Sequence, residues 1–427
     1  MHKRTGLALL AACLLLLAGC GAERETVAVE PDTAVQSIVP ETDLTSLRQF
    51  NWDGDLWQLD GTTMYTTVAA PQSRGKLLQT VDLNTGKRQA FCSKPGCAHQ
   101  DESCGAWLDC ESEIAVLPME DGRLVLVYGR YGPLEEQGAE PSAAVELRDT
   151  SGAVVCPATP LPNRPASTFY TDGIAVYYLW EQWQEDGSVN VSLIRIELDA
   201  AKGFGQASTA AFWQLPATLS LTGRCTEQGM IAIRWEHRME GQTQVVQHRE
   251  LCLVQWDGTV RTVAEAKGGQ SFLVTDMGET ETFCFDSTTG TMARLDLATG
   301  ETELFARLPE GLQLTEGSAC VGDVLICNFI QDGEAKPFYM EKDGDSVEIR
   351  RQTSHNGYLR PAMVLDVLED GRLIVDLGDL EYEESYTDQT GQRITSRTSE
   401  TLLGVCTPEQ YREGAADCLT LETNHKF

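Results

Sequence analysis

One short stretch of this chain carries residues whose types and spacing could do chemistry together. It runs from Phe91 to Cys104, reads FCSKPGCAHQDESC, and contains Cys92, Cys97, His99 and Cys104. Three thiolates and one imidazole are the ligand set of a closed, tetrahedral zinc site of the structural kind. Because a catalytic zinc keeps one position open for water or substrate, four protein ligands favour a structural site over a catalytic one.

The spacing lets the chain bring these groups together. Pro95-Gly96 suits the centre of a type II turn, which would fold Cys97 back toward Cys92. If the chain then leaves the turn extended, Cys97 and His99 point to the same side, since side chains alternate along a strand. We therefore expect zinc or a similar thiophilic metal to bind here.

Two other interpretations stay open at this point. The first is a disulfide, which could join Cys92 to Cys97 across the turn or could join Cys104 to Cys110. In that case His99 would be an exposed loop residue. The second is a reactive thiol. The spacing is not that of a standard zinc knuckle, so the residues alone do not decide among metal, disulfide and reactive thiol.

The sequence contains 14 cysteines, and many lie outside this stretch. Several sit in apolar, strand-like runs, where a cysteine is most often a small buried hydrophobic residue; the clearest are Cys252, Cys284, Cys327 and Cys406. Many unpaired cysteines in an exported chain would indicate surroundings poor in oxidants. Pairing stays open among Cys225, Cys320, Cys327, Cys406 and Cys418.

The N-terminal residues predict where the chain goes. Residues 1–20 read MHKRTGLALLAACLLLLAGC, a basic start followed by an apolar run that is too short to span a bilayer. We expect residues 1–19 to be a cleaved signal peptide. The stretch from Leu17 to Cys20 resembles the lipobox of bacterial lipoproteins, and this resemblance implies that Cys20 is acylated, for example with palmitate. An ordinary signal peptide with a chance cysteine is the alternative.

Acyl chains at about 0.8 kcal/mol per buried methylene would hold the chain on a membrane surface without a spanning helix. We therefore expect a protein anchored to the cell membrane on its extracytoplasmic side. Residues 20–44 are acidic and polar, with Pro31 and Pro40, and predict a flexible tether.

The charge of the chain excludes some classes of partner. The net charge of −31 becomes about −33 when Lys3 and Arg4 leave with residues 1–19. Nucleic acids and anionic headgroups repel such a surface. We expect no nucleic-acid partner, and contact with the membrane only through the lipid.

A repeat predicts the fold of residues 45–427. Seven glycines each begin an apolar or alternating run and are spaced 44 to 61 residues apart: Gly61, Gly122, Gly173, Gly229, Gly278, Gly322 and Gly371. A second strand pair with an Asp-Gly or Thr-Gly turn commonly follows. Four strands per repeat are typical of a β-propeller blade, so we predict an all-β, seven-bladed β-propeller. Eight blades, or two β-sandwich domains, are the alternatives.

The Cys-rich stretch lies in the longest of these periods. We place it as an insertion, residues 92–110, between the last strand of the first blade and the first strand of the second. An insertion with few apolar residues needs a cross-link to hold its shape, which favours a structural role. We also expect residues 50–59 and 418–422 to meet and to close the ring, one terminus supplying a strand to the blade built by the other.

The mature chain as a whole resembles the uncharacterised propeller lipoproteins of Gram-positive anaerobic bacteria. In that family a lipobox and an acidic tether precede a TolB-like or quinoprotein-like propeller with a Cys-rich loop after the first blade. The resemblance rests on the lipobox at Leu17 to Cys20, on the three cysteines and the histidine above, and on the closing segment LLGVCTPEQYREG. It implies no known activity.

Signatures of common enzymes do not occur in the sequence. There is no Gly-x-Ser-x-Gly, no phosphate-binding glycine loop and no His-Glu-x-x-His, and His237, His248 and His355 have no Ser or Cys placed to suggest a triad. We expect a monomeric binding or scaffold module for a protein, peptide or glycan at the cell surface. The alternative is a propeller enzyme that acts on carbohydrate or uses a quinone cofactor, which would need converging carboxylates or arginines near the axis.

Trp180 and Trp183 are a candidate ligand platform, because two indole rings at a blade edge could stack on a sugar. The alternative is that one ring packs in the core and the other covers a hairpin.

Overall fold

The computed structural model divides the chain into two compact units, Met1–Thr33 and Ala34–Phe427, and the residues that it describes all belong to the second. These residues are 37–38, 44, 47–51, 57–69, 75–99, 102–110, 114–129, 143–163, 165–166, 168–199, 203–240, 243–273, 280–344, 346–355, 357–387, 393–414 and 417–423. The expected signal peptide, Cys20 and most of the expected tether lie outside them. Within this part of the chain, no helix is both long and apolar enough to cross a membrane.

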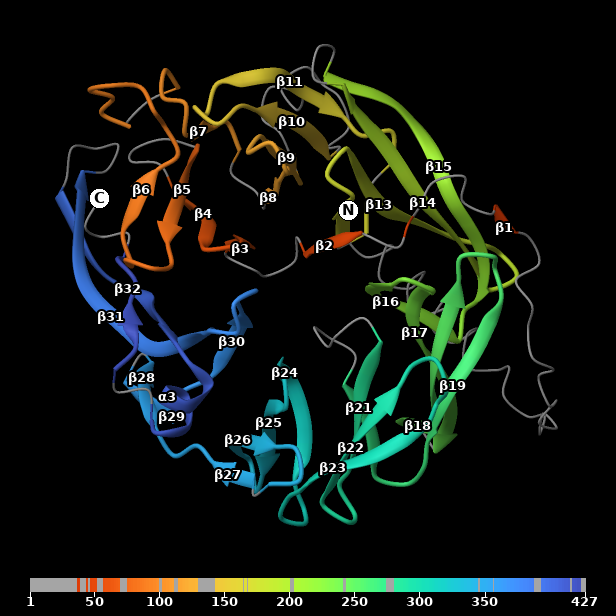
Figure 1. Cartoon of the computed structure of the whole chain (residues 1–427). Helices are drawn as coiled ribbons and strands as arrows, with labels where there is room; N and C mark the ends of the chain where they lie inside the picture. The colour runs from red at the N-terminus through yellow and green to blue at the C-terminus, as the bar shows by residue number, and fades with distance from the viewer. Residues whose placement is uncertain are drawn as a thin grey trace, which may run out of the picture. The chain divides into compact units, whose positions relative to one another are not determined.

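Seven small antiparallel sheets are arranged around a common centre as the blades of a β-propeller (Figure 1). We number the blades I to VII along the chain. Blade I contains β3 (Trp57–Asp60), β4 (Thr63–Ala69), β5 (Lys76–Asp82), β6 (Arg88–Ala90) and β7 (Trp107–Leu108). Blade II contains β8 (Ile114–Pro118), β9 (Leu124–Tyr128), β10 (Ala144–Arg148) and β11 (Val154–Pro160). Blade III contains β12 (Thr168–Thr171), β13 (Ala175–Trp183), β14 (Ser188–Asp199) and β15 (Gly203–Pro216).

Blades IV to VII follow the same order. Blade IV contains β16 (Leu219–Thr226), β17 (Gly229–Glu240), β18 (Thr243–Gln255) and β19 (Val260–Ala266), and blade V contains β20 (Gln270–Leu273), β21 (Glu281–Asp286), β22 (Thr291–Asp296) and β23 (Thr302–Arg307). Blade VI contains β24 (Gln313–Val321), β25 (Val324–Gln331), β26 (Glu334–Glu341) and β27 (Ser346–Glu348). Blade VII contains β30 (Val364–Val367), β31 (Leu373–Thr387), β32 (Arg393–Cys406) and β33 (Leu419–Thr420). The prediction of seven blades is confirmed.

The glycine period arises because each repeat begins with the same turn. In six blades the marked glycine stands between the first and second strands or opens the second, with positive φ, for example Gly122 at φ 79° between β8 and β9. Glycine reaches this conformation without the steric cost that a Cβ imposes. The seventh, Gly278, lies outside the described residues.

The core is divided among the seven contacts between neighbouring blades. One apolar cluster lies at each contact, because the side chains of a strand alternate between its two faces. On β17, Met230 and Ala232 pack toward blade III, while Ile231 and Ile233 pack toward blade V. Every blade is thus buried on both faces.

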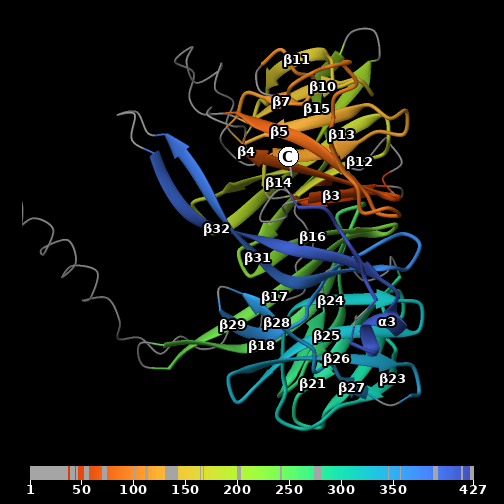
Figure 2. The same ribbon diagram turned by 90° about the vertical axis from the view of Figure 1, so that its left-hand side faces the viewer.

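One hairpin and one short helix near the C-terminal end of the chain lie outside the four-strand pattern, and the hairpin of β31 and β32 extends beyond it. A hairpin of β28 (Gln352–His355) and β29 (Tyr358–Pro361) joins blade VI to blade VII. The short helix α3 (Pro408–Arg412) precedes β33, and its N-cap Thr407 forms a capping box with Gln410. In Figure 2, β31 and β32 continue as a long hairpin beyond the other strands of their blade.

The N-terminal strands do not close the ring in the way we expected. β2 (Arg48–Asn51) pairs with β12 at the inner edge of blade III, with Phe50 opposite Phe169, and β1 (Ser37–Ile38) pairs with β15 at the outer edge. Leu44 is buried in the contact between blades III and IV. The end of the expected tether is therefore part of the folded body, where the side chain of Leu44 packs against the apolar cluster.

Blades I and VII meet without exchanging a strand. Each takes its strands from one continuous part of the chain, and the C-terminal residues bridge them through hydrogen bonds: Glu422 donates its N–H to Gly86 O at 2.9 Å, and Arg88 Nε donates to Glu422 O at 2.7 Å. Leu421 is 2% exposed and packs with Leu83 and Leu403. The C-terminal segment does close the ring, as expected, but through packing and hydrogen bonds.

If this contact closes the ring, Leu421→Ala should lower the free energy of unfolding by about 2–5 kcal/mol, because it leaves a cavity between blades VII and I. Urea unfolding measures the change. Leu304→Ala on β23, where the leucine is 45% exposed, is the matched control and should change the value by about 0.5 kcal/mol or less. Equal effects of the two substitutions would contradict this account of closure.

Candidate metal centre

The Cys-rich insertion interrupts the outermost strand of blade I. β5 pairs with β6 through residues 79–81 and with β7 through residues 76–77, and between them Leu78 hydrogen-bonds Phe91 N–H and Ala106 O. β6 and β7 thus lie end to end at the same strand position beside β5. Residues 91–106 form the insertion that connects them. Our placement of the insertion between two blades was wrong by one strand, since β7 still belongs to blade I.

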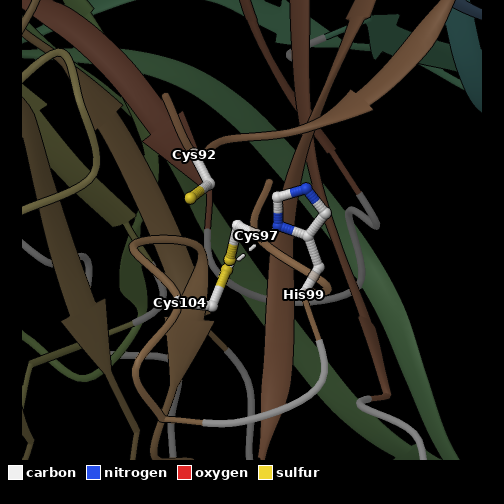
Figure 3. A group of neighbouring side chains, drawn as sticks. All are labelled: Cys92, Cys97, His99 and Cys104. Atoms are coloured by element: carbon white, nitrogen blue, oxygen red, sulfur yellow. Dashed lines mark hydrogen bonds between the residues drawn. The ribbon is translucent and has the colours of Figure 1, made fainter. Parts of the chain in front are cut away.

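The four predicted ligands meet in this insertion. One ligand atom from each of Cys92, Cys97, His99 and Cys104 lies within 4.8 Å of the others, and His99 Nδ1 is 3.2 Å from Cys104 Sγ. Figure 3 shows the imidazole ring of His99 beside the cysteine side chains. The four groups are therefore close enough together to hold a metal ion.

The backbone conformation is as predicted at the Pro95-Gly96 turn but differs from the prediction at His99. Cys97 N–H donates to Lys94 O at 3.2 Å, and Gly96 has φ 71°, which is the predicted type II turn. His99, however, has φ 55°, so the chain is not extended there. The reason we gave for the convergence of Cys97 and His99 was wrong, because a left-handed residue brings the imidazole to the thiols.

The thiols differ in how readily they ionise. Burial raises the pKa of Cys92, but the backbone N–H groups of Lys94 and Gly105 and the neighbouring thiols outweigh burial, so the pKa falls below its usual value. Burial raises the pKa of Cys104, the N–H of Ala106 opposes this, and the neighbouring Cys97 and Cys92 add to the increase, so that the pKa is about 12. Cys92 therefore ionises more readily than Cys104.

Blade II supports the insertion from the other side. Arg148 on β10 donates to Gly105 O at 2.6 Å, and its Nε donates to the buried Glu146 at 2.6 Å. Gly152, in the β10–β11 turn, lies so close that a Cβ there would be 2.6 Å from the carbonyl oxygens of Phe91 and Gly105. The insertion thus contacts both blades. The sequence held no signal for Arg148, whose partner lies 43 residues away.

All twelve cysteines that the structure describes, from Cys92 to Cys418, are free thiols. Cys104 packs with Leu77 and Ala106, whereas Cys110 packs in the contact between blades I and II. Of the two disulfides considered above, the pair Cys104–Cys110 is thus divided between two clusters, while Cys92 and Cys97 belong to the four-residue group.

The two tryptophans of the candidate ligand platform lie on β13. Trp180 packs against the apolar cluster between blades II and III, while Trp183 is 68% exposed near the turn to β14. Positions three apart on a strand face opposite sides of the sheet. The structure does not bring the two rings together on one face.

A second polar cluster, which we did not predict, surrounds His355 on β28. Its Nδ1 is 2.9 Å from Asp379 Oδ1, and its Nε2 is 2.9 Å from the Thr353 hydroxyl. This order of groups is that of a nucleophile, a base and an orienting acid. Thr353, however, is 4% exposed and donates to Arg360 O at 3.3 Å, so its hydroxyl is closed to a substrate. The cluster fastens the β28–β29 hairpin to β31.

Three charged groups near the axis, Arg48, Asp60 and Arg224, form links between blades. Arg48 on β2 lies 3.2 Å from Asp60 of blade I and donates to Pro118 O of blade II at 2.8 Å. Arg224 donates to Glu281 O of blade V at 2.8 Å. On the innermost strands, the Lys, Arg, Asp and Glu side chains whose surroundings the structure describes are Arg48, Asp60, Arg224 and Asp366.

Comparison with known proteins adds similarity in fold and nothing closer. No family model and no curated protein matches the chain. Among solved structures it is similar to a prolyl endopeptidase, with 11% identity and a TM-score of 0.47 over 83% of this chain and 50% of that one. A puromycin-hydrolyzing peptidase from Mycobacterium tuberculosis gives 13% identity and a TM-score of 0.43 over 87% of this chain and 61% of that one.

A putative 6-phosphogluconolactonase from Bacteroides fragilis gives 12% identity and a TM-score of 0.33 over 86% of this chain and 99% of that one. The chain spans about half the length of the prolyl endopeptidase structure. At these identities and TM-scores the similarities carry no argument about activity or partners, and the fold assignment rests on the strand topology.

If the four residues bind a metal together, cobalt(II) added to the reduced protein should give the charge-transfer and d–d absorption of a tetrahedral thiolate site. Cys97→Ser removes one thiolate and should weaken cobalt binding by roughly tenfold or more. Cys156→Ser on β11, outside the cluster, is the control and should bind as the unaltered protein does. Unchanged cobalt spectra and affinity in Cys97→Ser would contradict a four-ligand site.

Proposed function

We propose that this chain is a lipid-anchored, extracytoplasmic binding or scaffold module, whose propeller presents one rim to a protein, peptide or glycan. A structural zinc ion holds its Cys-rich insertion. The lipobox-like sequence before Cys20 supports the anchor and the location. The propeller fold supports a docking surface, because loops from all blades gather at the two rims of the ring.

We choose a binding module over an enzyme because of the contacts that the charged side chains near the axis make. Arg48 is occupied by Asp60 and by the Pro118 carbonyl, and Arg224 by a carbonyl of the next blade. Among the described charged side chains of the innermost strands, Arg48, Asp60 and Arg224 therefore connect blades. Asp366 accepts a hydrogen bond from the N–H of its neighbour Val367 at 2.8 Å. A general acid or base needs a group placed toward a substrate, which these contacts do not provide.

The donor set supports zinc as the metal. Zinc is bound by thiolate sulfur and imidazole nitrogen in four-coordinate structural sites, and three cysteines with one histidine satisfy it without water. The site lies at the outer edge of blade I, where β6 and β7 pair with β5. A metal ion uses all four side chains, whereas a disulfide would use only two.

Protein purified without oxygen should therefore contain about one equivalent of zinc. Elemental analysis together with a count of free thiols measures this. Less than roughly a tenth of an equivalent of zinc, with two fewer free thiols than expected, would contradict the zinc site and would indicate a disulfide there.

The anchor has its own test. Cys20→Ala should move the protein from the membrane fraction to the soluble fraction, because the acyl chains are its attachment. Cys13→Ala, within the same N-terminal segment, should leave the protein in the membrane. Retention of Cys20→Ala in the membrane fraction would contradict lipid anchoring.

Binding is tested with the folded unit alone. Labelled residues 34–427 should bind saturably to intact cells of the source organism, and prior treatment of those cells with protease or with glycosidase should distinguish a protein or peptide partner from a glycan. Heat-unfolded protein is the control. Absence of saturable binding, or cleavage of a glycan by the added protein, would overturn the assignment as a binding module.

A further inference from the structure

Two cysteines face each other where the last strand of the ring joins its blade. β32 and β33 pair with Gly404 opposite Thr420 and Val405 opposite Leu419, so the next position places Cys406 opposite Cys418. Both cysteines pack against the apolar cluster between blades VI and VII. They are therefore cross-strand neighbours, although 11 residues separate them in the chain.

The register places this pair at a site suited to a disulfide. Leu421 N–H donates to Leu403 O at 2.9 Å, which marks that pair as hydrogen-bonded. Hydrogen-bonded and non-hydrogen-bonded pairs alternate along antiparallel strands, so the pair of cysteines, three positions further on, is non-hydrogen-bonded. Cα atoms at such positions lie about 4.5 Å apart, within the range of about 4.4–6.8 Å that a disulfide spans.

The two thiols have unequal surroundings. Cys406 is 2% exposed, and Cys418 is only partly buried. The hydrogen bond from the Cys406 thiol lowers the pKa of Cys418, and the positive charge of Arg351 lowers it further against the opposing effect of burial. The same hydrogen bond, together with burial, raises the pKa of Cys406 above its usual value. Cys418 is thus the more nucleophilic and more accessible sulfur.

Between the two cysteines lies the helix α3, which is fixed at several points. Tyr411 is fully buried and its hydroxyl donates to Ala362 O at 2.8 Å, and Arg351 donates to Gly414 O at 2.6 Å. Directly after Cys418 come β33, Leu421 and Glu422, the residues that join blade VII to blade I. A covalent bond at Cys418 would hold this closing segment on β32.

We propose that Cys406 and Cys418 are a redox-active pair that forms a disulfide and locks the closing segment of the ring. The oxidant is a low-molecular-weight disulfide. The Cys418 thiolate attacks one of its sulfurs, which forms a mixed disulfide and releases one thiolate. Cys406 then loses its proton and attacks the Cys418 sulfur, releasing the second thiolate. Two protein thiols are oxidised, one external disulfide is reduced to two thiols, and a reducing dithiol reverses the reaction.

The test uses the full chain, purified in detergent under reducing conditions and then exposed to oxidised glutathione. Non-reducing digestion and mass spectrometry should recover a peptide that links Cys406 to Cys418. The oxidised protein should unfold at a temperature higher by roughly 2 °C or more, because the bond restricts the unfolded chain. Addition of dithiothreitol should abolish both changes.

Variants at the pair and elsewhere separate the site from general thiol oxidation. Cys418→Ser should lose the linked peptide and the temperature shift, while Cys284→Ser, on β21 in blade V, should keep both. Should Cys418→Ser fail to fold, the peptide map of the unaltered protein decides. Linkage of Cys418 to any other cysteine, a mixed disulfide that persists, or a linked pair without a change in unfolding temperature would each overturn the proposal.

Discussion

Each blade of this protein is apolar on both faces, so each must be covered on both sides, and only a closed ring covers all of them. The seven apolar clusters, one for each contact between blades, express this constraint directly. Because the buried apolar residues lie in the contacts between blades, no single blade has a core of its own. The contact between the first and last blades therefore matters as much as any other, although no chain connection supports it.

In three places, segments of the chain cover the edge of a blade or join it to a neighbouring blade. Leu421 and Glu422 close blade VII onto blade I through packing and backbone hydrogen bonds. β2 covers the inner edge of blade III, and β1 covers its outer edge. The Cys-rich insertion breaks the outer strand of blade I and rests on the β10–β11 turn of blade II, with Arg148 bonded to its Gly105. The metal ion that we propose would let a segment with few apolar residues keep the shape that these contacts need.

The sequence predicted the features that local patterns encode and missed those that depend on contacts between distant parts of the chain. The glycine period follows from a turn that every blade shares, so the number of blades was readable from the residues, and so was the Pro95-Gly96 turn. The conformation of His99 could not be predicted, because a non-glycine residue adopts positive φ only when its surroundings impose it. The His355 cluster and the place of β2 depend on contacts between distant parts of the chain, which local patterns do not encode.

The central claim of this account is that three cysteines and one histidine form a closed structural metal site that holds the insertion between two blades. Zinc K-edge X-ray absorption of the protein, isolated without oxygen, tests it most directly. The account predicts about three sulfur neighbours near 2.3 Å and one nitrogen neighbour near 2.0–2.1 Å. A first shell dominated by oxygen and nitrogen, or one with fewer than three sulfurs, would contradict it.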